Sequence, residues 1–413
     1  MTTKLPSLGH HKPTGQAYVR LNGQMLYLGP WGRPDTTQRY LREIAEWIAR
    51  GRQLKVSPHE ITVMELCAAY SEHAQSYYLK PDGAPTSELQ RINMALRGLK
   101  GMYGDMPAAQ FGPNALRALR ESWVNKEIES KNTHVKKRLS RKTVNDYAAE
   151  VKRCFKWGVS HELIPGTVYH ALAALEGLRQ GRSEARETAP VKPVLQKYID
   201  AAKKHTSRQV AALIDLQLLT AARSGELLGL RPIDFDTSGK VWRATIRDHK
   251  TAYYGKERVL YFGPKAQALV KDFMGDRPLD ACLFSPREAE TERYANAKDH
   301  RHQEVEQPKT ERRLRDRYTP DTYRQAIEYA CRNAAKEAAK AAGKEGDTEY
   351  LKDLVKKYLW TPHRLRHNAA TEIRRQYGLE AAQVMLGHAR ADVTQIYAEI
   401  NSHKALEIAA QMG

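Results

Sequence analysis

Two short runs of alternating apolar and polar residues open the chain, and helical spacing follows them. Residues 17–21 and 25–28 flank Asn22 and Gly23, and an Asn-Gly pair between such runs favours a tight β-hairpin turn. Apolar residues then recur every three or four positions over residues 40–48, as on one face of an amphipathic helix. Residues 1–58 are therefore predicted to form a hairpin-helix module.

Residues 59–180 repeat apolar positions at helical spacing. Ser140 suits the N-cap of one helix and Pro165 the start of another. The predicted helices lie near residues 61–70, 88–98, 115–126, 140–157 and 165–177. This pattern predicts a helical domain of ordinary size. The polar stretch 181–190, nearly free of apolar side chains, is typical of a linker.

Over residues 191–413, helical spacing of apolar residues is interrupted by short strand-like runs. This pattern predicts a second domain with helices and a few strands. The predicted helices lie near 194–199, 211–220, 266–274 and 319–334, and the strands over 241–246 and 259–262. The charged segment 287–317 has no clear period, so we expect an insertion or extended loop there, partly helical near Arg312. Residues 402–413 predict a last amphipathic helix, and the fold class is mainly α with a small β component.

The net charge of +19 over 413 residues changes the picture, because it favours nucleic acid or an anionic membrane surface as the partner. No apolar run approaches the ~18 residues of a membrane span, and the first residues lack an apolar signal core. We therefore expect a cytoplasmic protein with no membrane contact. The 4 cysteines are far apart without a CxxC pair, which favours buried free thiols.

The candidate chemistry begins in the stretch WTPHRLRHNAATEIRRQYG. Thr361 and Pro362 suit a helix start. His363 and Arg366 then share one helix face, near the end where backbone amides favour an anion. Gly378 is expected to end this helix.

Further candidates lie on both sides of that helix. His388 follows a short apolar run, and the lone Tyr397 comes after a second polar run. Upstream, Arg223 lies among leucines, where an unpaired charge is costly, and Glu226 is one helical turn on, suitably spaced to hold it. Lys250 lies between the two predicted strands.

The order of these motifs resembles the active site of the tyrosine recombinases, the phage integrase family. The resemblance covers the catalytic motifs over roughly 190–413 and, in helix pattern only, extends back to about residue 60. It implies a helical core-binding domain that clamps one side of a DNA duplex, followed by a mixed α/β catalytic domain. The catalytic residues that it implies are Arg223, Lys250, His363, Arg366, His388 and Tyr397.

The resemblance also implies a role for each residue. The two arginines hold the non-bridging phosphate oxygens, while His388 bonds an oxygen and His363 is the base. Tyr397 attacks phosphorus and forms a 3′-phosphotyrosyl bond. Lys250 protonates the leaving 5′ oxygen, with Lys256 of the same predicted hairpin as the alternative.

No cofactor is expected, because a covalent intermediate conserves the phosphodiester energy without metal or ATP. The pairs His10-His11 and His300/His302 lack a convincing ligand set. The family commonly has glycine where this chain has Ala221, and we expect the small alanine to be tolerated. His367 lies about 100° around the helix from Arg366 and is expected to support the site from behind.

The basic run before and within the fourth predicted helix is a candidate phosphate-binding surface, although a solvated charged face is the alternative. Its named candidates are Lys136, Lys137, Arg138, Arg141, Lys142 and Arg153. The implied partner is double-stranded DNA at a specific site, bound by a homo-tetramer on synapsed DNA and by a monomer or weak oligomer otherwise. The setting would be the bacterial nucleoid or a phage-infected cell.

Several alternatives stay open from the sequence. The sequence is also compatible with His388 as a helix-capping or core histidine. Tyr397 is likewise compatible with an ordinary half-buried tyrosine, one of the 21 in the chain. Residues 1–58 suit either an arm-site DNA-binding module or a structural appendage, and the last helix suits packing on a neighbouring protomer or on its own domain. A type IB topoisomerase shares the chemistry, and a non-catalytic DNA-binding regulator shares the basic charge.

Overall fold

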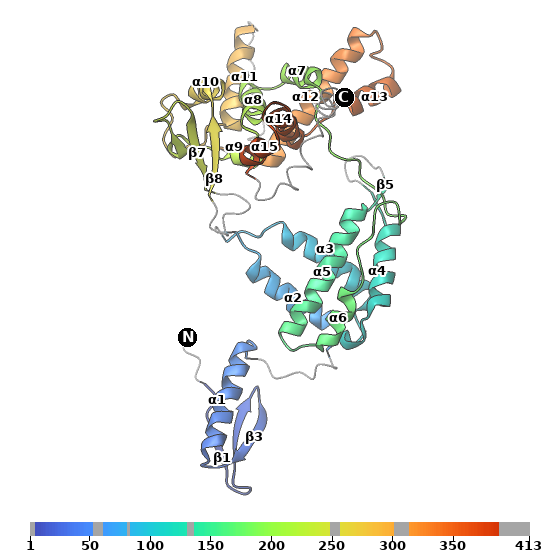
Figure 1. Ribbon diagram of the computed structural model, residues 1–413, viewed down its shortest axis with the longest axis vertical. Coiled ribbons are helices and arrows are strands. Elements are labelled where there is room, and N and C mark those ends of the chain that lie inside the picture. Colours follow the sequence, from blue (N-terminus) through green and yellow to red (C-terminus); the bar gives the residue numbers. More distant parts are fainter. Residues whose placement is uncertain are drawn as a thin grey trace, which may run out of the picture. The chain divides into compact units, whose positions relative to one another are not determined.

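The computed structural model describes residues 5–52, 61–80, 83–129, 136–247, 257–300 and 314–387. The chain divides into two compact units, Met1–Ala189 and Pro190–Gly413 (Figure 1). Helices dominate both units in the described ranges, and the strands pair antiparallel in small sheets. The predicted fold class, mainly α with a small β component, is confirmed. None of the described helices combines the length and apolar character that a bilayer span requires.

The N-terminal module is a three-stranded sheet with one helix. Its elements are β1 (Gly9–His11), β2 (Gln16–Leu21), β3 (Gln24–Pro30) and α1 (Pro34–Ala49). The predicted hairpin is confirmed, since Asn22 and Gly23 form its turn with φ of 46° and 85°, the left-handed conformation that such turns require. Val19, Leu28 and Trp47 belong to a small core shared by the sheet and the helix.

The rest of the first unit is a helix bundle around one core, and the predicted helices are confirmed. The helices are α2 (Val63–Tyr77), α3 (Glu88–Tyr103), α4 (Pro113–Asn125), α5 (Arg141–Ser160) and α6 (Gly166–Ala173), with a 3-10 turn η1 (Ala108–Gln110). The Ser140 side chain caps α5 as predicted, by accepting from the Thr143 amide. A hairpin of β4 (Glu127–Glu129) and β5 (Lys136–Arg138), which the sequence pattern did not reveal, precedes α5.

Part of the segment expected as linker lies on the helix bundle. Ala185 is buried in the bundle core, Arg186 pairs with Ser140 in a parallel bridge, and Glu187 accepts from Arg141 at 2.6 Å. The boundary between the two compact units therefore falls after these contacts, at Ala189 and Pro190.

In the second unit a three-stranded antiparallel sheet, β6-β7-β8, lies at one side of the helices (Figure 1). The strands are β6 (Phe235–Asp236), β7 (Trp242–Ile246) and β8 (Arg258–Phe262). The helices are α7 (Gln196–Lys203), α8 (Arg208–Thr220), α9 (Ser224–Leu228), α10 (Pro264–Met274), α11 (Pro286–His300), α12 (Pro320–Ala341), α13 (Thr348–Tyr358), α14 (Pro362–Tyr377) and α15 (Leu379–Leu386), with a 3-10 turn η2 (Pro232–Asp234). One large core joins α7, α8, α10 and α12 to the sheet.

The expectation of a loop over 287–317 is wrong for its first part, because α11 runs from Pro286 to His300. This helix has no sustained apolar stripe for periodicity to detect. Its sequence is rich in Glu, Ala and Arg, which favour helix locally, and Arg293 pairs with Glu290 one turn away. Arg312 lies outside the described residues. Helix α13, with no buried residue, was also missed.

The start of the second unit is hydrogen-bonded to α14. Asn368 donates to the Val194 carbonyl and accepts from its amide, each at 2.6 Å. Arg364 donates to the carbonyls of Lys192 and Pro193 at 2.8 and 3.0 Å. The helix that carries His363 and Arg366 therefore also holds the segment that enters this unit.

Replacing Asn368 with alanine is expected to destabilise the second unit by about 1–3 kcal/mol, because the buried Val194 backbone loses both bonds. Heat or urea unfolding of the full chain measures the loss. Tyr377→Ser, at a position 72% exposed on the same helix, is the control and should change stability by no more than about 0.5 kcal/mol. Unchanged stability of Asn368→Ala would contradict the assigned role.

Candidate active site

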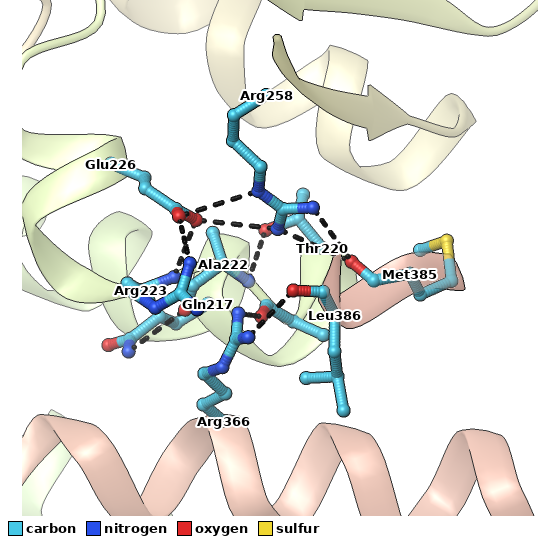
Figure 2. A network of polar contacts seen from close by, with 10 residues as sticks. Gln217, Thr220, Ala222, Arg223, Glu226, Arg258, Arg366, Met385 and Leu386 are labelled. Atoms are coloured by element: carbon cyan, nitrogen blue, oxygen red, sulfur yellow. Dashed lines mark hydrogen bonds and ion pairs between the residues drawn. The ribbon is translucent and has the colours of Figure 1, made fainter. Parts of the chain in front are cut away.

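Arg366 is the buried centre of the candidate site. Helix α14 begins at Pro362 after Thr361 as predicted, although the Thr361 side chain makes no capping bond. The Arg366 side chain is 0% exposed, and its terminal nitrogens donate to the Ala221 carbonyl at 2.6 Å and the Leu386 carbonyl at 2.7 Å (Figure 2). These carbonyls close α8 and α15, whose C-terminal ends carry partial negative charge. One guanidinium therefore joins three helices.

Ala221 takes a backbone conformation that favours glycine. It ends α8 in the left-handed region, with φ of 54° and ψ of 22°, which costs an L-residue about 1–2 kcal/mol. Its methyl group is buried with Ala369, Ala370 and Leu386, and burying one such group returns about 0.8 kcal/mol. The difference from the family glycine is thus a matter of backbone angle more than of side-chain size.

Arg223 stands at the N-cap of α9 and is held by Glu226, as the sequence predicts. The Arg223 amide donates to Glu226 Oε2 at 2.9 Å and its guanidinium to Oε1 at 2.7 Å. The Glu226 side chain is only 4% exposed, whereas 41% of the Arg223 side chain is exposed. Of the two predicted phosphate-binding arginines, Arg223 therefore faces solvent and Arg366 does not.

The same carboxylate binds Arg258, which the sequence analysis did not select. Arg258 begins β8, and its guanidinium lies 3.4 Å from both Glu226 oxygens. Burial opposes ionisation of Glu226, but Arg258 and Arg223 outweigh burial and lower the pKa of this carboxyl. A signal was available, because Arg258 alternates with the buried Leu260 and Phe262 and so faces the core.

Gln217 links the Arg223 turn to the start of α14. This buried side chain donates to the Ala222 carbonyl at 3.3 Å and to the Pro362 carbonyl at 3.0 Å. Its own oxygen accepts from the Tyr323 hydroxyl at 3.2 Å. A polar residue at 0% exposure is costly to bury unless its hydrogen bonds are made, so Gln217 positions both segments. It was also missed from the sequence.

His363 lies in the first turn of α14 and is exposed to solvent. Partial desolvation lowers the pKa of its imidazole below the ordinary 6.5, and Arg366 and Arg223 lower it further. The ring is therefore neutral at pH 7 and able to accept a proton. His367 is 4% exposed and meets His363 edge to face, with 5.1 Å between ring centroids. This fits the expected supporting place of His367.

The remaining predicted site residues, Lys250 with its alternative Lys256, His388 and Tyr397, lie outside the described residues. Arg223, His363 and Arg366 are described. Arg366 binds the turn that leads into Arg223 (Figure 2), and the charges of both arginines act on His363. Among the described residues, no group of His, Cys, Asp and Glu is arranged to hold a metal ion.

Comparisons with known proteins identify the family of the chain. The family model "Phage integrase family" matches residues 192–404, so the chain belongs to the phage integrase family, the tyrosine-type DNA strand transferases that carry out site-specific recombination. No curated protein matches the sequence.

Solved structures share the fold at low identity. A lambda integrase dimer bound to a COC′ core site has a TM-score of 0.51 and 13% identity, over 97% of this chain and 96% of that one. The Tn1549 transposon integrase in complex with circular intermediate DNA has a TM-score of 0.53 and 15% identity, over 86% and 100%. At such identity the likeness concerns the fold alone.

The lowered pKa of His363 can be tested directly. NMR titration of the full chain, labelled at the histidine rings, is expected to give a pKa below 6.5 for His363. Arg223→Met removes one nearby positive charge and should raise this pKa, because protonation is then opposed less. His170→Gln identifies a different ring signal and should leave the His363 titration unchanged. A His363 pKa above the ordinary value would contradict the described surroundings.

Proposed function

We propose that this protein is a site-specific DNA recombinase, an integrase, that cleaves and rejoins strands through a covalent 3′-phosphotyrosyl intermediate without metal or ATP. The observation that supports this most is the contact of Arg366 with the Ala221 carbonyl, in the turn that leads into Arg223. Two distant guanidiniums thereby meet at one place, as a phosphate cradle requires.

The charge balance of this place favours an anionic ligand. Arg223 and Arg258 pair with the single carboxylate of Glu226, while Arg366 binds the carbonyls of Ala221 and Leu386 nearby (Figure 2). Within this group the positive charge exceeds the negative. A phosphodiester carries one negative charge, and attack on phosphorus adds more at its equatorial oxygens, which such a site stabilises.

Binding the phosphate requires a local rearrangement at Arg366. Both terminal nitrogens are bonded to carbonyls, and the side chain has no exposed surface. Arg223, which is 41% exposed, would meet the phosphate first. Arg366 would join it once the Leu386 carbonyl at the end of α15 moves aside, so DNA binding and opening of the site are coupled.

In the proposed reaction the neutral His363 accepts the Tyr397 proton as the phenol oxygen attacks phosphorus and the bond to the 5′ oxygen breaks. Lys250, or Lys256 in its place, gives the leaving 5′ oxygen a proton, and His388 bonds a non-bridging oxygen. A 5′ hydroxyl from a partner duplex then displaces the tyrosine. Each step exchanges one phosphoester bond for another, so the energy of the phosphodiester is conserved and neither ATP nor metal is needed.

The proposed partner is double-stranded DNA, with four protomers on two synapsed sites and a monomer or weak oligomer otherwise. A lambda integrase dimer on a core site supports the DNA assignment by its fold. The sheet of strands β1 to β3 would contact arm-site DNA, and the place of action is the cytoplasm, where bacterial or phage DNA lies. A type IB topoisomerase would instead relax DNA of any sequence as a monomer.

The first unit supplies the proposed DNA surface. Strand β5 carries Lys136, Lys137 and Arg138, all exposed, and Lys142 is exposed on the first turn of α5. Arg141 and Arg153 are engaged in ion pairs with Glu187 and Glu150. We therefore place the first phosphate contacts at the four exposed residues and regard the two paired arginines as contacts that DNA must share with these carboxylates.

The covalent intermediate is the direct test of the function. On a nicked suicide substrate built from the flanks of the natural element, the native chain should form a protein–DNA adduct, and Tyr397→Phe should form none. Arg223→Ala should lower the cleavage rate at least about 100-fold, in line with loss of one oxyanion donor. An adduct that survives in Tyr397→Phe would refute the nucleophile, and no adduct with the native chain would favour the non-catalytic regulator.

The DNA surface is tested by the salt dependence of binding. Lys136→Ala and Lys137→Ala should each reduce the slope of log affinity against log salt by about 1, the effect of one lost phosphate contact. Lys136→Arg and Lys137→Arg keep the charge and should keep the slope. Slopes equal to wild type in both alanine variants would show that β5 is a solvated face instead.

A further inference from the structure

Two arginines from different elements hold consecutive carbonyls at the end of α15. Arg258 donates to the Met385 carbonyl through both terminal nitrogens, at 3.4 and 3.3 Å, and Arg366 donates to the next carbonyl, Leu386, at 2.7 Å. The last carbonyls of a helix lack partners within the helix and carry its partial negative charge. The end of α15 is thus fixed by cations on both sides (Figure 2).

We propose that Arg258 is a positioning residue that fixes the end of α15 against the Arg223–Glu226 pair and so directs the following chain, with His388 and Tyr397, to the phosphate. This inference rests on the proposed function. Arg258 bridges both parts, because the same guanidinium that holds Met385 lies 3.4 Å from each Glu226 oxygen.

Two features of Gly387, its backbone angle and its lack of a side chain, suit the contact between Arg258 and the Met385 carbonyl. Its φ is +64°, a conformation that favours glycine, and a Cβ added there would lie 2.3 Å from Arg258 Nη1. Because the Arg258 side chain is only 7% exposed and is held by Glu226, it has little freedom to move away. A methyl group at residue 387 should therefore displace the guanidinium from Met385 and disturb the same contact from the other side.

Packing does not explain why residue 258 is an arginine. Leu260 and Phe262 fill the other inward positions of β8, and an apolar residue at 258 would be buried without desolvating a charge. Replacing a buried ion pair by apolar residues is often neutral or stabilising. An arginine here provides a planar fork that reaches a carboxylate and a carbonyl together, which a leucine or a lysine cannot do.

The experiment compares single-turnover cleavage by the full chain on two nicked substrates, one normal and one with sulfur in place of the bridging 5′ oxygen at the scissile phosphate. A thiolate leaves without a proton, so the sulfur substrate should rescue Lys250→Ala. Arg258→Met and Arg258→Lys should cleave the normal substrate about 100-fold slower, the effect of a misplaced reacting group, and should not be rescued, because their defect lies in the approach of Tyr397.

Gly387→Ala should show the same unrescued loss, and combining it with Arg258→Met should add little, since both disturb one contact. Arg243→Met, at an exposed ion pair with Asp236 on the neighbouring strand, is the control and should cleave at the wild-type rate. Melting temperature and DNA affinity are measured alongside, and Arg258→Lys keeps a positive charge beside Glu226 should Arg258→Met fail to fold.

The outcomes distinguish failure of the proposed function from failure of the positioning role of Arg258. If the wild-type chain forms no adduct, the proposed function falls. If it does, but the Arg258→Lys rate stays near wild type, or the sulfur substrate restores the slow variants, then the positioning role of Arg258 is refuted while the function stands.

Discussion

The second unit depends on how it accommodates a guanidinium with no exposed surface. Arg366 satisfies its terminal nitrogens on the Ala221 and Leu386 carbonyls, at the ends of two helices. An isolated buried charge would be prohibitive, and backbone carbonyls at helix ends offset part of that cost because they are already dipole-negative. The positions at which α8 and α15 stop are therefore tied to one side chain of α14.

That constraint explains several features that otherwise look unrelated. Ala221 adopts left-handed backbone angles that bring its carbonyl to Arg366 and turn the chain into Arg223. Gln217 binds this turn to the first residue of α14. Glu226 holds Arg223 on one side and Arg258 on the other. Together these contacts fix Arg223 and Arg258 against Glu226, whereas Arg366 remains bonded to two backbone carbonyls.

Much of the described site could be predicted from sequence, because its parts obey local rules. Arg223 with Glu226 and His363 with Arg366 are pairs three residues apart. A helix-start signal located the second pair, and the surrounding leucines and the family resemblance located the first. Arg258 was overlooked although its alternation with Leu260 and Phe262 indicates that it faces the core. The partners of Gln217 are distant in sequence, so no local rule selects it. Helix α11 was missed for a different reason. It has little buried apolar surface, so its sequence shows no helical period.

The sequence does not distinguish how accessible Arg223 and Arg366 are. Arg223 and Arg366 were equivalent as candidate phosphate ligands, yet one is 41% exposed and the other 0%. This difference arises from how α8 and α15 end around Arg366, which is a property of tertiary packing. It also divides the proposed phosphate binding into two steps, a first contact at Arg223 and a later one at Arg366.

Binding of one phosphate by Arg223 and Arg366 is best tested by a structure of the full chain bound to its own recombination site. We expect both guanidiniums to hydrogen-bond the scissile phosphate and Arg366 to have exchanged the Leu386 carbonyl for a phosphate oxygen. A complex in which that phosphate lies elsewhere, with Arg366 still enclosed between Ala221 and Leu386, would contradict it.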